Sequence, residues 1–208
     1  MSGFELAALW FAWALAGASP GPATLGIAST SMARGRRAGI IFALGILTGG
    51  ATWGIAAALG MSALMLANAW VFEVLRYAGA AYLMYLAAKS LRSAMSDKPG
   101  LTGKAQSGTA WRIYSKGVLV HLTNPKAILS WGAIYAITLP PDASGADLTF
   151  MFCFLYSGGL VVFISYAFLF SSQKVVQGYT RARRWFEGAF ALLFGAAGFK
   201  ILTTRVVS

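Results

Sequence analysis

The chain contains six long apolar stretches, and these constrain its fold more than any other feature. They lie at about 4–33, 38–66, 70–92, 113–139, 147–172 and 183–204. Each has at least the roughly 20 residues that a helix needs to cross about 30 Å of hydrocarbon. Hydrophobic residues make up 58% of the 208 residues and charged residues only 11%, and no stretch alternates like a barrel strand. We therefore predict an all-α, polytopic membrane protein of six transmembrane helices that forms one domain over residues 1–208.

The first apolar stretch resembles a secretion signal only superficially. No Lys or Arg precedes it, and Glu5 lies at its start. A cleaved signal peptide normally begins with a positive charge. We expect this segment to be retained as the first membrane helix.

The positive charge of the chain is sorted between alternate connections. The net charge is +11, and 13 of the 17 Lys and Arg residues lie in or beside the first, third and fifth connections. Basic loops stay on the cytoplasmic side of a membrane, so both termini should face the opposite side. Membrane orientation explains the charge, and we expect contact with the lipid bilayer and no nucleic-acid partner. The cations are Arg34, Arg36, Arg37, Lys89, Arg92, Lys98, Lys104, Arg112, Lys116, Lys174, Arg181, Arg183 and Arg184.

Two apolar stretches carry helix-breaking residues near their middle. SPGP occupies 19–22 in the first and NP occupies 124–125 in the fourth. Proline removes a backbone donor and clashes with the preceding turn, so each stretch should split into two half-helices. Breaks in the first and fourth of six spans indicate a 3+3 inverted repeat. Its halves would be about 4–92 and 113–204, joined by a polar cytoplasmic loop at about 93–112.

The second half-helices should begin near Ala23 and Lys126 and bring their amino ends together within the membrane. Unpaired N–H groups and the helix dipole make such ends suitable for an anion. Lys126 lies too deep to reach the surface comfortably and should face the interior. We expect it to hold a substrate carboxylate, the alternative being a structural bond to carbonyls freed by the break.

Other polar residues near the breaks have two interpretations each. His121 is a candidate proton carrier or a neutral histidine bonded to freed carbonyls. Hydroxyl side chains could line the site or bond back to their own helix. GILTG at 45–49 and the Gly/Ala-rich faces of the third and sixth spans predict close helix packing. The hydroxyl candidates are Thr24, Thr48, Thr52 and Thr123.

The reactive residues are too few for an enzyme. The chain has one His and one Cys, and we expect no Asp or Glu in the middle of the spans. Nucleophilic or metal catalysis needs a larger cluster, so we expect no enzyme, no metal and no cofactor. An ion channel and a non-transporting assembly subunit stay open as alternatives to a transporter.

Four motifs in this order and spacing resemble the lysine-exporter (LysE/RhtB) family over nearly the whole chain. They are SPGPATL at 19–25, RGRRAG at 34–39, GAAYLMYL at 79–86 and G-x-x-x-H-L-T-NPKAIL at 117–129. The resemblance implies export of amino acids or small derivatives from a bacterial cytoplasm across the inner membrane by proton antiport. Both termini would then be periplasmic, and a homodimer is allowed.

The resemblance also assigns site residues. The family's PGP falls on Pro20, Gly21 and Pro22, and its NPK falls on Asn124, Pro125 and Lys126. The expected substrate site comprises these six with Ala23, Thr24 and His121. Ala23 and His121 depart from the Asn that family members often carry there. Together with the lack of a mid-membrane acid, this favours a neutral amino acid or small zwitterion.

Overall fold

The computed structural model of the chain describes residues 2–67, 69–96, 104–140 and 142–203. These residues form seven α-helices and no β-strand, which confirms the all-α class. The helices are α1 (Gly3–Ala18), α2 (Pro22–Ala67), α3 (Ala69–Ala94), α4 (Ala110–Leu122), α5 (Pro125–Thr138), α6 (Gly145–Leu169) and α7 (Gln173–Thr203).

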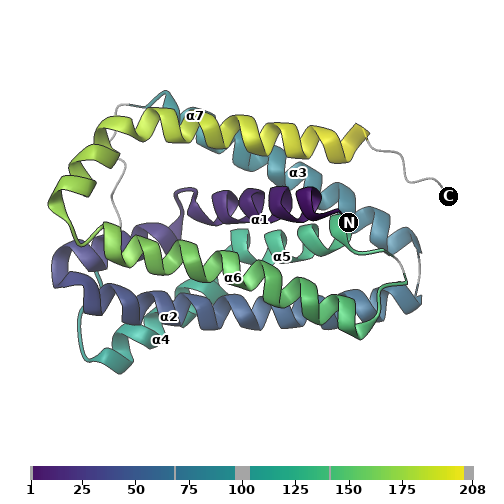
Figure 1. Cartoon of the computed structure of the whole chain (residues 1–208), viewed down its shortest axis with the longest axis horizontal. Helices are drawn as coiled ribbons and strands as arrows, with labels where there is room; N and C mark the ends of the chain where they lie inside the picture. Colours follow the sequence, from purple (N-terminus) through teal and green to yellow (C-terminus); the bar gives the residue numbers. More distant parts are fainter. Residues whose placement is uncertain (1, 68, 97–103, 141, 204–208) are drawn as a thin grey trace.

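Helix α2 is two helical arms joined by a sharp turn at Gly35. The backbone of Gly35 has φ 78° and ψ 173°, a conformation that a residue with a side chain rarely adopts. The chain reverses direction there, at the left of Figure 1. The arm 22–34 thus continues the path of α1, and the arm 36–67 runs back along the bundle.

Both expected helix breaks are present. Ser19–Gly21 separate α1 from α2, and Thr123–Asn124 separate α4 from α5. Ser19 is extended, with ψ 143°, because a residue before proline is excluded from the helical region. The two interrupted segments, α1 with the arm 22–34 and α4 with α5, run in opposite directions (Figure 1).

Two helix pairs approach closely through small residues, as the glycine patterns predicted. A Cβ built on Gly117 of α4 would lie 2.4 Å from the carbonyl oxygen of Phe42 and 3.1 Å from the Cα of Gly45. A Cβ on Gly198 of α7 would lie 3.2 Å from the carbonyl oxygen of Ala80 of α3. Helix α2 therefore packs tightly on α4, and α3 on α7.

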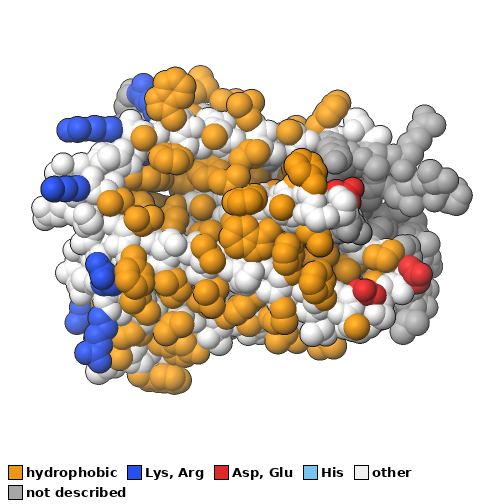
Figure 2. Space-filling view, in the orientation of Figure 1, with side chains coloured by type: hydrophobic (Ala, Val, Ile, Leu, Met, Phe, Trp, Pro, Cys, Tyr) orange, Lys and Arg blue, Asp and Glu red, His pale blue; other side chains and the backbone are white. Residues whose placement is uncertain are grey.

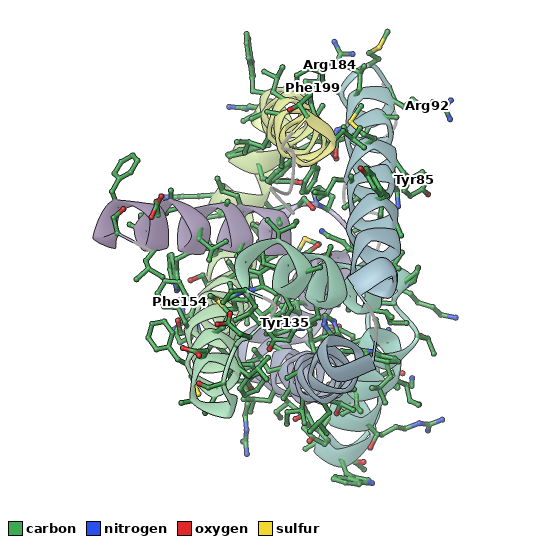
Figure 3. All side chains as sticks on the ribbon, turned by 90° about the vertical axis from the view of Figure 1, so that its right-hand side faces the viewer. Tyr85, Arg92, Tyr135, Phe154, Arg184 and Phe199 are labelled. Carbon is green, nitrogen blue, oxygen red and sulfur yellow. The ribbon has the colours of Figure 1, made fainter. Side chains whose placement is uncertain are left out.

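The remaining helices pack around these pairs. α6 lies against α1 and α2, and α5 contacts α2 and α3. Figure 3 looks along the bundle and shows Tyr135 of α5 in its interior and Phe199 of α7 at its periphery. One buried cluster joins Tyr135 and Trp131 to Leu155 and Met151 of α6.

The face of the molecule drawn in Figure 2 has a hydrophobic middle and charged ends. On the face shown in Figure 2, hydrophobic side chains cover the centre, Lys and Arg lie at one end, and Asp and Glu lie at the other. Within the described residues, the stretches Pro22–Gly60, which contains the turn at Gly35, and Gly145–Leu169 have the length and apolar composition of membrane-crossing segments. This distribution suits a protein immersed in lipid.

Helix α7 starts earlier than predicted. We expected a span at about 183–204, but the helix begins at Gln173. Its first turns, QKVVQGYTRA, are too polar for a membrane stretch, yet they contain no proline and one glycine, so the helix is not interrupted. Part of the expected loop 93–112, residues 97–103, lies outside the described residues.

Candidate functional site

The two helix breaks lie next to each other, and Lys126 joins them. Its Nζ donates to the carbonyl oxygen of Ser19 at 3.2 Å and also to the Ser19 hydroxyl. A Cβ built on Gly21 would lie 3.9 Å from Cδ of Lys126. Two segments 107 residues apart in the sequence are thus held together by one side chain.

Thr24 makes hydrogen bonds to the backbone groups that are left unpaired at the first break. The amide of Gly21 donates to Thr24 Oγ1 at 3.0 Å, and that hydroxyl lies 3.3 Å from the carbonyl oxygens of Ser19 and Gly21. The Tyr166 hydroxyl of α6 donates to the carbonyl oxygen of Ala18 at 2.5 Å. These side chains replace the helical bonds that the prolines remove.

The second break is a capped helix start. Asn124 Oδ1 accepts from the amide of Lys126 at 3.1 Å, and Pro125 occupies the first helical position of α5, where its missing N–H costs nothing. Trp53 Nε1 of α2 donates to the carbonyl oxygen of Leu122 at 3.2 Å. The carbonyl freed at the end of α4 is therefore also satisfied.

A cavity of about 70 Å³ lies between the two breaks. It is large enough for about five water molecules, which is comparable to a small amino acid. Six polar side chains and four aromatic side chains line it: Ser19, Thr24, His121, Asn124, Lys126 and Ser130, and Trp13, Trp131, Tyr156 and Phe163. The cavity has a polar side at the breaks and an aromatic side from α1, α5 and α6.

Six of the nine predicted site residues line this cavity. They are Gly21, Ala23, Thr24, His121, Asn124 and Lys126. The lining does not include Pro20, Pro22 or Pro125, of which Pro22 and Pro125 are exposed. The prolines shape the breaks instead of facing the space between them.

Lys126 makes a structural bond to a backbone carbonyl at a break, which was the expected alternative to carboxylate binding. Its ammonium group sits on the carbonyl end of α1, where the helix dipole is negative. Lys126 is only partly buried and lines the cavity. Its role in holding a substrate carboxylate stays a prediction.

His121 is buried, at 6% exposure, with its ring edge-on to Phe163 at 5.9 Å between centroids. Its Nδ1 has no hydrogen-bond partner in the described part of the chain, so this nitrogen is not bonded to a freed carbonyl. Gly50 provides the room for the ring, since a Cβ there would lie 3.4 Å from Nε2. His121 therefore has free hydrogen-bonding capacity beside the cavity.

Three of the four threonine candidates bond back to their own helices. The hydroxyls of Thr48, Thr52 and Thr123 donate to the carbonyl oxygens of Leu44, Thr48 and Leu119, and all three side chains are exposed. Thr24 alone among them lines the cavity. For the other three, the structure confirms the second interpretation, a hydroxyl that bonds back to its own helix.

Sequence reasoning missed the aromatic side of the cavity and one buried acid. Trp13 and Trp131 meet edge to face at 4.9 Å between centroids, and both line the cavity. Glu187 of α7 is buried, at 4% exposure, inside a predicted span. We expected no buried carboxylate, and Glu187 corrects this; it lies near the start of the span expected at 183–204, not in its middle, and it does not line the cavity.

Fold and site together define a helical membrane protein in which two interrupted helices meet at an internal cavity with a polar side and an aromatic side. A family model described as "LysE type translocator" matches residues 14–205. The chain belongs to this family, which makes it a transport protein and not an enzyme.

Proteins named as amino-acid efflux proteins are similar to most of the chain. A threonine efflux protein of Salmonella typhimurium is 29% identical over 192 residues, covering 90% of this chain and 92% of that protein. The threonine efflux protein of Escherichia coli K12 is 27% identical over 190 residues, with the same two coverages. A leucine efflux protein of Salmonella choleraesuis is 30% identical over 168 residues, covering 79% of this chain and 77% of that protein. No solved structure matches the chain significantly.

Proposed function

We propose that this chain exports amino acids or small amino-acid derivatives from the bacterial cytoplasm, driven by the proton gradient. The observation that carries the proposal is the cavity between the two helix breaks, with Lys126 at its polar side. Relatives named for threonine and leucine efflux support amino acids as the substrate class.

The cavity offers complementary groups for a zwitterion. Lys126 and the amino end of α5 suit a carboxylate, since both carry positive charge or partial charge. The carbonyl oxygen of Ser19 suits an ammonium group. Trp13 and Trp131 would then contact the substrate side chain. The whole proposed substrate site comprises Pro20, Gly21, Pro22, Ala23, Thr24, His121, Asn124, Pro125 and Lys126.

The architecture that goes with this function is a 3+3 inverted repeat of six membrane spans. In support, each proposed half starts with an interrupted helix, and the two interrupted helices run in opposite directions (Figure 1). The last helices of the halves, α3 and α7, pack on each other. Inverted repeats place the substrate site at mid-membrane between broken helices.

In this arrangement the basic end of the bundle faces the cytoplasm. Lys and Arg gather at the end that holds the Gly35 turn and the connection from α6 to α7 (Figure 2). By the positive-inside rule, both termini are then periplasmic in the inner membrane. A homodimer is compatible with this orientation.

His121 is the proton-coupling candidate within the cavity. It is a titratable side chain with an unpartnered Nδ1, one helical turn before the break at Asn124. Histidine exchanges protons near neutral pH more readily than any other side chain.

The testing experiment is transport by purified protein in liposomes. Labelled threonine, leucine and a mixed amino-acid pool would be supplied, with and without an imposed proton gradient. We expect gradient-driven accumulation of one class of neutral amino acid, abolished by an uncoupler. Flux that never exceeds equilibration would favour a channel, and no flux from folded protein would favour an assembly subunit.

A further inference from the structure

The cavity changes from polar to apolar along helix α5. Lys126 at the start of α5 and Trp131 both line the cavity, and five residues of helix rise separate them by about 7.5 Å along the axis. Leu155 of α6 also lines the cavity and belongs to the same buried cluster as Trp131. In the proposed binding mode, Lys126 and Ser19 take the charged groups of the substrate, and its side chain extends toward Trp131. The indole and Leu155 then form the end wall of the space for that side chain.

Trp131 is a rigid part of this wall because other rings and a close helix contact enclose it. The side chain is 4% exposed, and its ring lies edge to face with Trp13 at 4.9 Å and stacks on Phe152 at 5.8 Å between centroids. Tyr135, one turn further along α5, lies in the bundle interior (Figure 3), with its ring 5.6 Å from that of Trp131. A Cβ built on Gly54 of α2 would lie 3.1 Å from Cζ2 of the indole. Packing this close leaves the indole no room to swing aside for a larger substrate.

Gly159 of α6 leaves room in another wall of the cavity. Leu155, Gly159 and Phe163 line the cavity at intervals of four residues, so they lie on one face of α6. Among the described residues, a Cβ built on Gly159 would meet only Cε2 of Phe163, at 3.9 Å, which is an ordinary contact distance. Neither close helix packing nor a positive φ therefore requires glycine at this position. The missing side chain enlarges the cavity, at the cost of a weaker helix former.

We propose that Trp131 is a specificity-determining residue that excludes aromatic amino acids, and that Gly159 provides the room for a branched aliphatic side chain. This inference rests on the proposed export function and names its substrate class, neutral amino acids with a compact, non-aromatic side chain. All of them present the same zwitterionic group to Lys126 and Ser19, so the walls decide among them. The cavity of about 70 Å³ holds about five water molecules, or about 150 Å³ of liquid water. A phenyl or indole ring in addition to the zwitterionic group would have to displace Trp131 or Leu155, and a close-packed core resists that.

The test is competition in the liposome exchange assay. The probe is labelled threonine or leucine, whichever the wild-type liposomes move, and the unlabelled competitors are alanine, leucine and phenylalanine, which differ only in their side chains. Phenylalanine should bind the wild type about tenfold or more weakly than leucine does, and Trp131→Leu, which opens the end wall, should reduce this difference to about threefold or less. Trp185→Leu, at a tryptophan of α7 that is 83% exposed, is the matched control and should keep the wild-type difference.

Gly159→Ala tests the size limit by a change that the fold accommodates, and it decides the question if Trp131→Leu does not fold. Its methyl group would take space from the cavity and meet only Phe163. The variant should weaken the binding of leucine relative to alanine by about tenfold. Gly132→Ala, at a glycine of α5 that does not line the cavity, is the matched control and should keep the wild-type ratio.

Three results would overturn the proposed size limit. They are equal competition by phenylalanine and leucine in the wild type, an unchanged difference between them in folded Trp131→Leu, and an unchanged ratio of leucine to alanine binding in Gly159→Ala. Failure of the wild type to move any amino acid would instead overturn the export function.

Discussion

Replacing Lys126 by methionine tests the proposed carboxylate contact most directly. Methionine keeps a stem of similar length and removes only the ammonium group. Removing one partner of a buried, hydrogen-bonded charge pair costs about 2–5 kcal/mol. Because Lys126 is only partly buried, the lower part of this range applies, and about 2–3 kcal/mol corresponds to a 30- to 150-fold weaker half-saturation constant.

The stability of the protein should change much less than its affinity for substrate. Lys126→Met removes two hydrogen bonds to Ser19, each charge-assisted. It also removes the cost of keeping an ammonium group away from water, which offsets much of that loss. We expect a net change within about 1 kcal/mol, read from thermal unfolding in detergent.

The assay is exchange of labelled substrate in liposomes over a range of concentrations. Lys116→Met is the matched control, because it removes the same charge from a half-buried position on α4 that does not line the cavity. An amino alcohol that lacks the carboxylate should inhibit the exchange of labelled substrate equally well in wild type and in Lys126→Met. If the amino alcohol binds Lys126→Met more weakly than wild type, as the amino acid does, then Lys126 acts only as a structural link between the breaks.

Three further outcomes follow from the helix contacts. Gly117→Ala should destabilise the fold by about 1–3 kcal/mol, because its Cβ would lie 2.4 Å from the Phe42 carbonyl oxygen. The control Gly132→Ala, whose Cβ would have nothing within 4 Å, should be neutral or slightly stabilising; thermal unfolding measures both. Replacing Pro20, Pro22 and Pro125 together by alanine should let both interrupted helices become continuous. Protection from hydrogen exchange should then rise around both breaks, and export should be abolished. Transport at the wild-type rate would show that the breaks are dispensable. Asn124→Ala should destabilise the start of α5 by about 1 kcal/mol and speed hydrogen exchange in its first turn, while Asn124→Asp keeps the cap and should leave exchange unchanged.

Local features of the sequence predicted much of the fold. Proline acts on its own and the preceding residues, so the breaks at Ser19–Gly21 and Thr123–Asn124 follow from the sequence. Long apolar stretches likewise located the helices. The start of α7 was missed because hydropathy marks membrane depth, whereas a helix continues through polar residues until something stops it.

The site was less predictable because its contacts join distant segments. No local rule pairs Lys126 with Ser19 or Glu187 with Ser93. Trp13 was also missed, since a helix that is apolar on all sides gives no periodic signal to show which face lines a cavity. The sequence did identify the site residues that change the backbone only near themselves, namely Gly21, Asn124 and the prolines.

The contact between Lys126 and Ser19 supports the proposal that the substrate is a zwitterion. An ammonium group here faces a helix-end carbonyl, which also accepts from the Thr24 hydroxyl at 3.3 Å, so Lys126 is the charged partner of this oxygen. A carboxylate that takes Lys126 leaves the Ser19 carbonyl without its cation, and an amine that takes the carbonyl leaves Lys126 without an acceptor. An ammonium group left unpaired costs roughly 1–3 kcal/mol or more, whereas the Ser19 carbonyl keeps its bond from Thr24 and loses only its charged partner. A zwitterion inserted between them supplies both partners at once, with its carboxylate to Lys126 and its ammonium group to Ser19. Under the proposed function, the two roles expected for Lys126 would be successive states of one site: it would tie the breaks together when the cavity is empty and bind the substrate carboxylate when the cavity is filled.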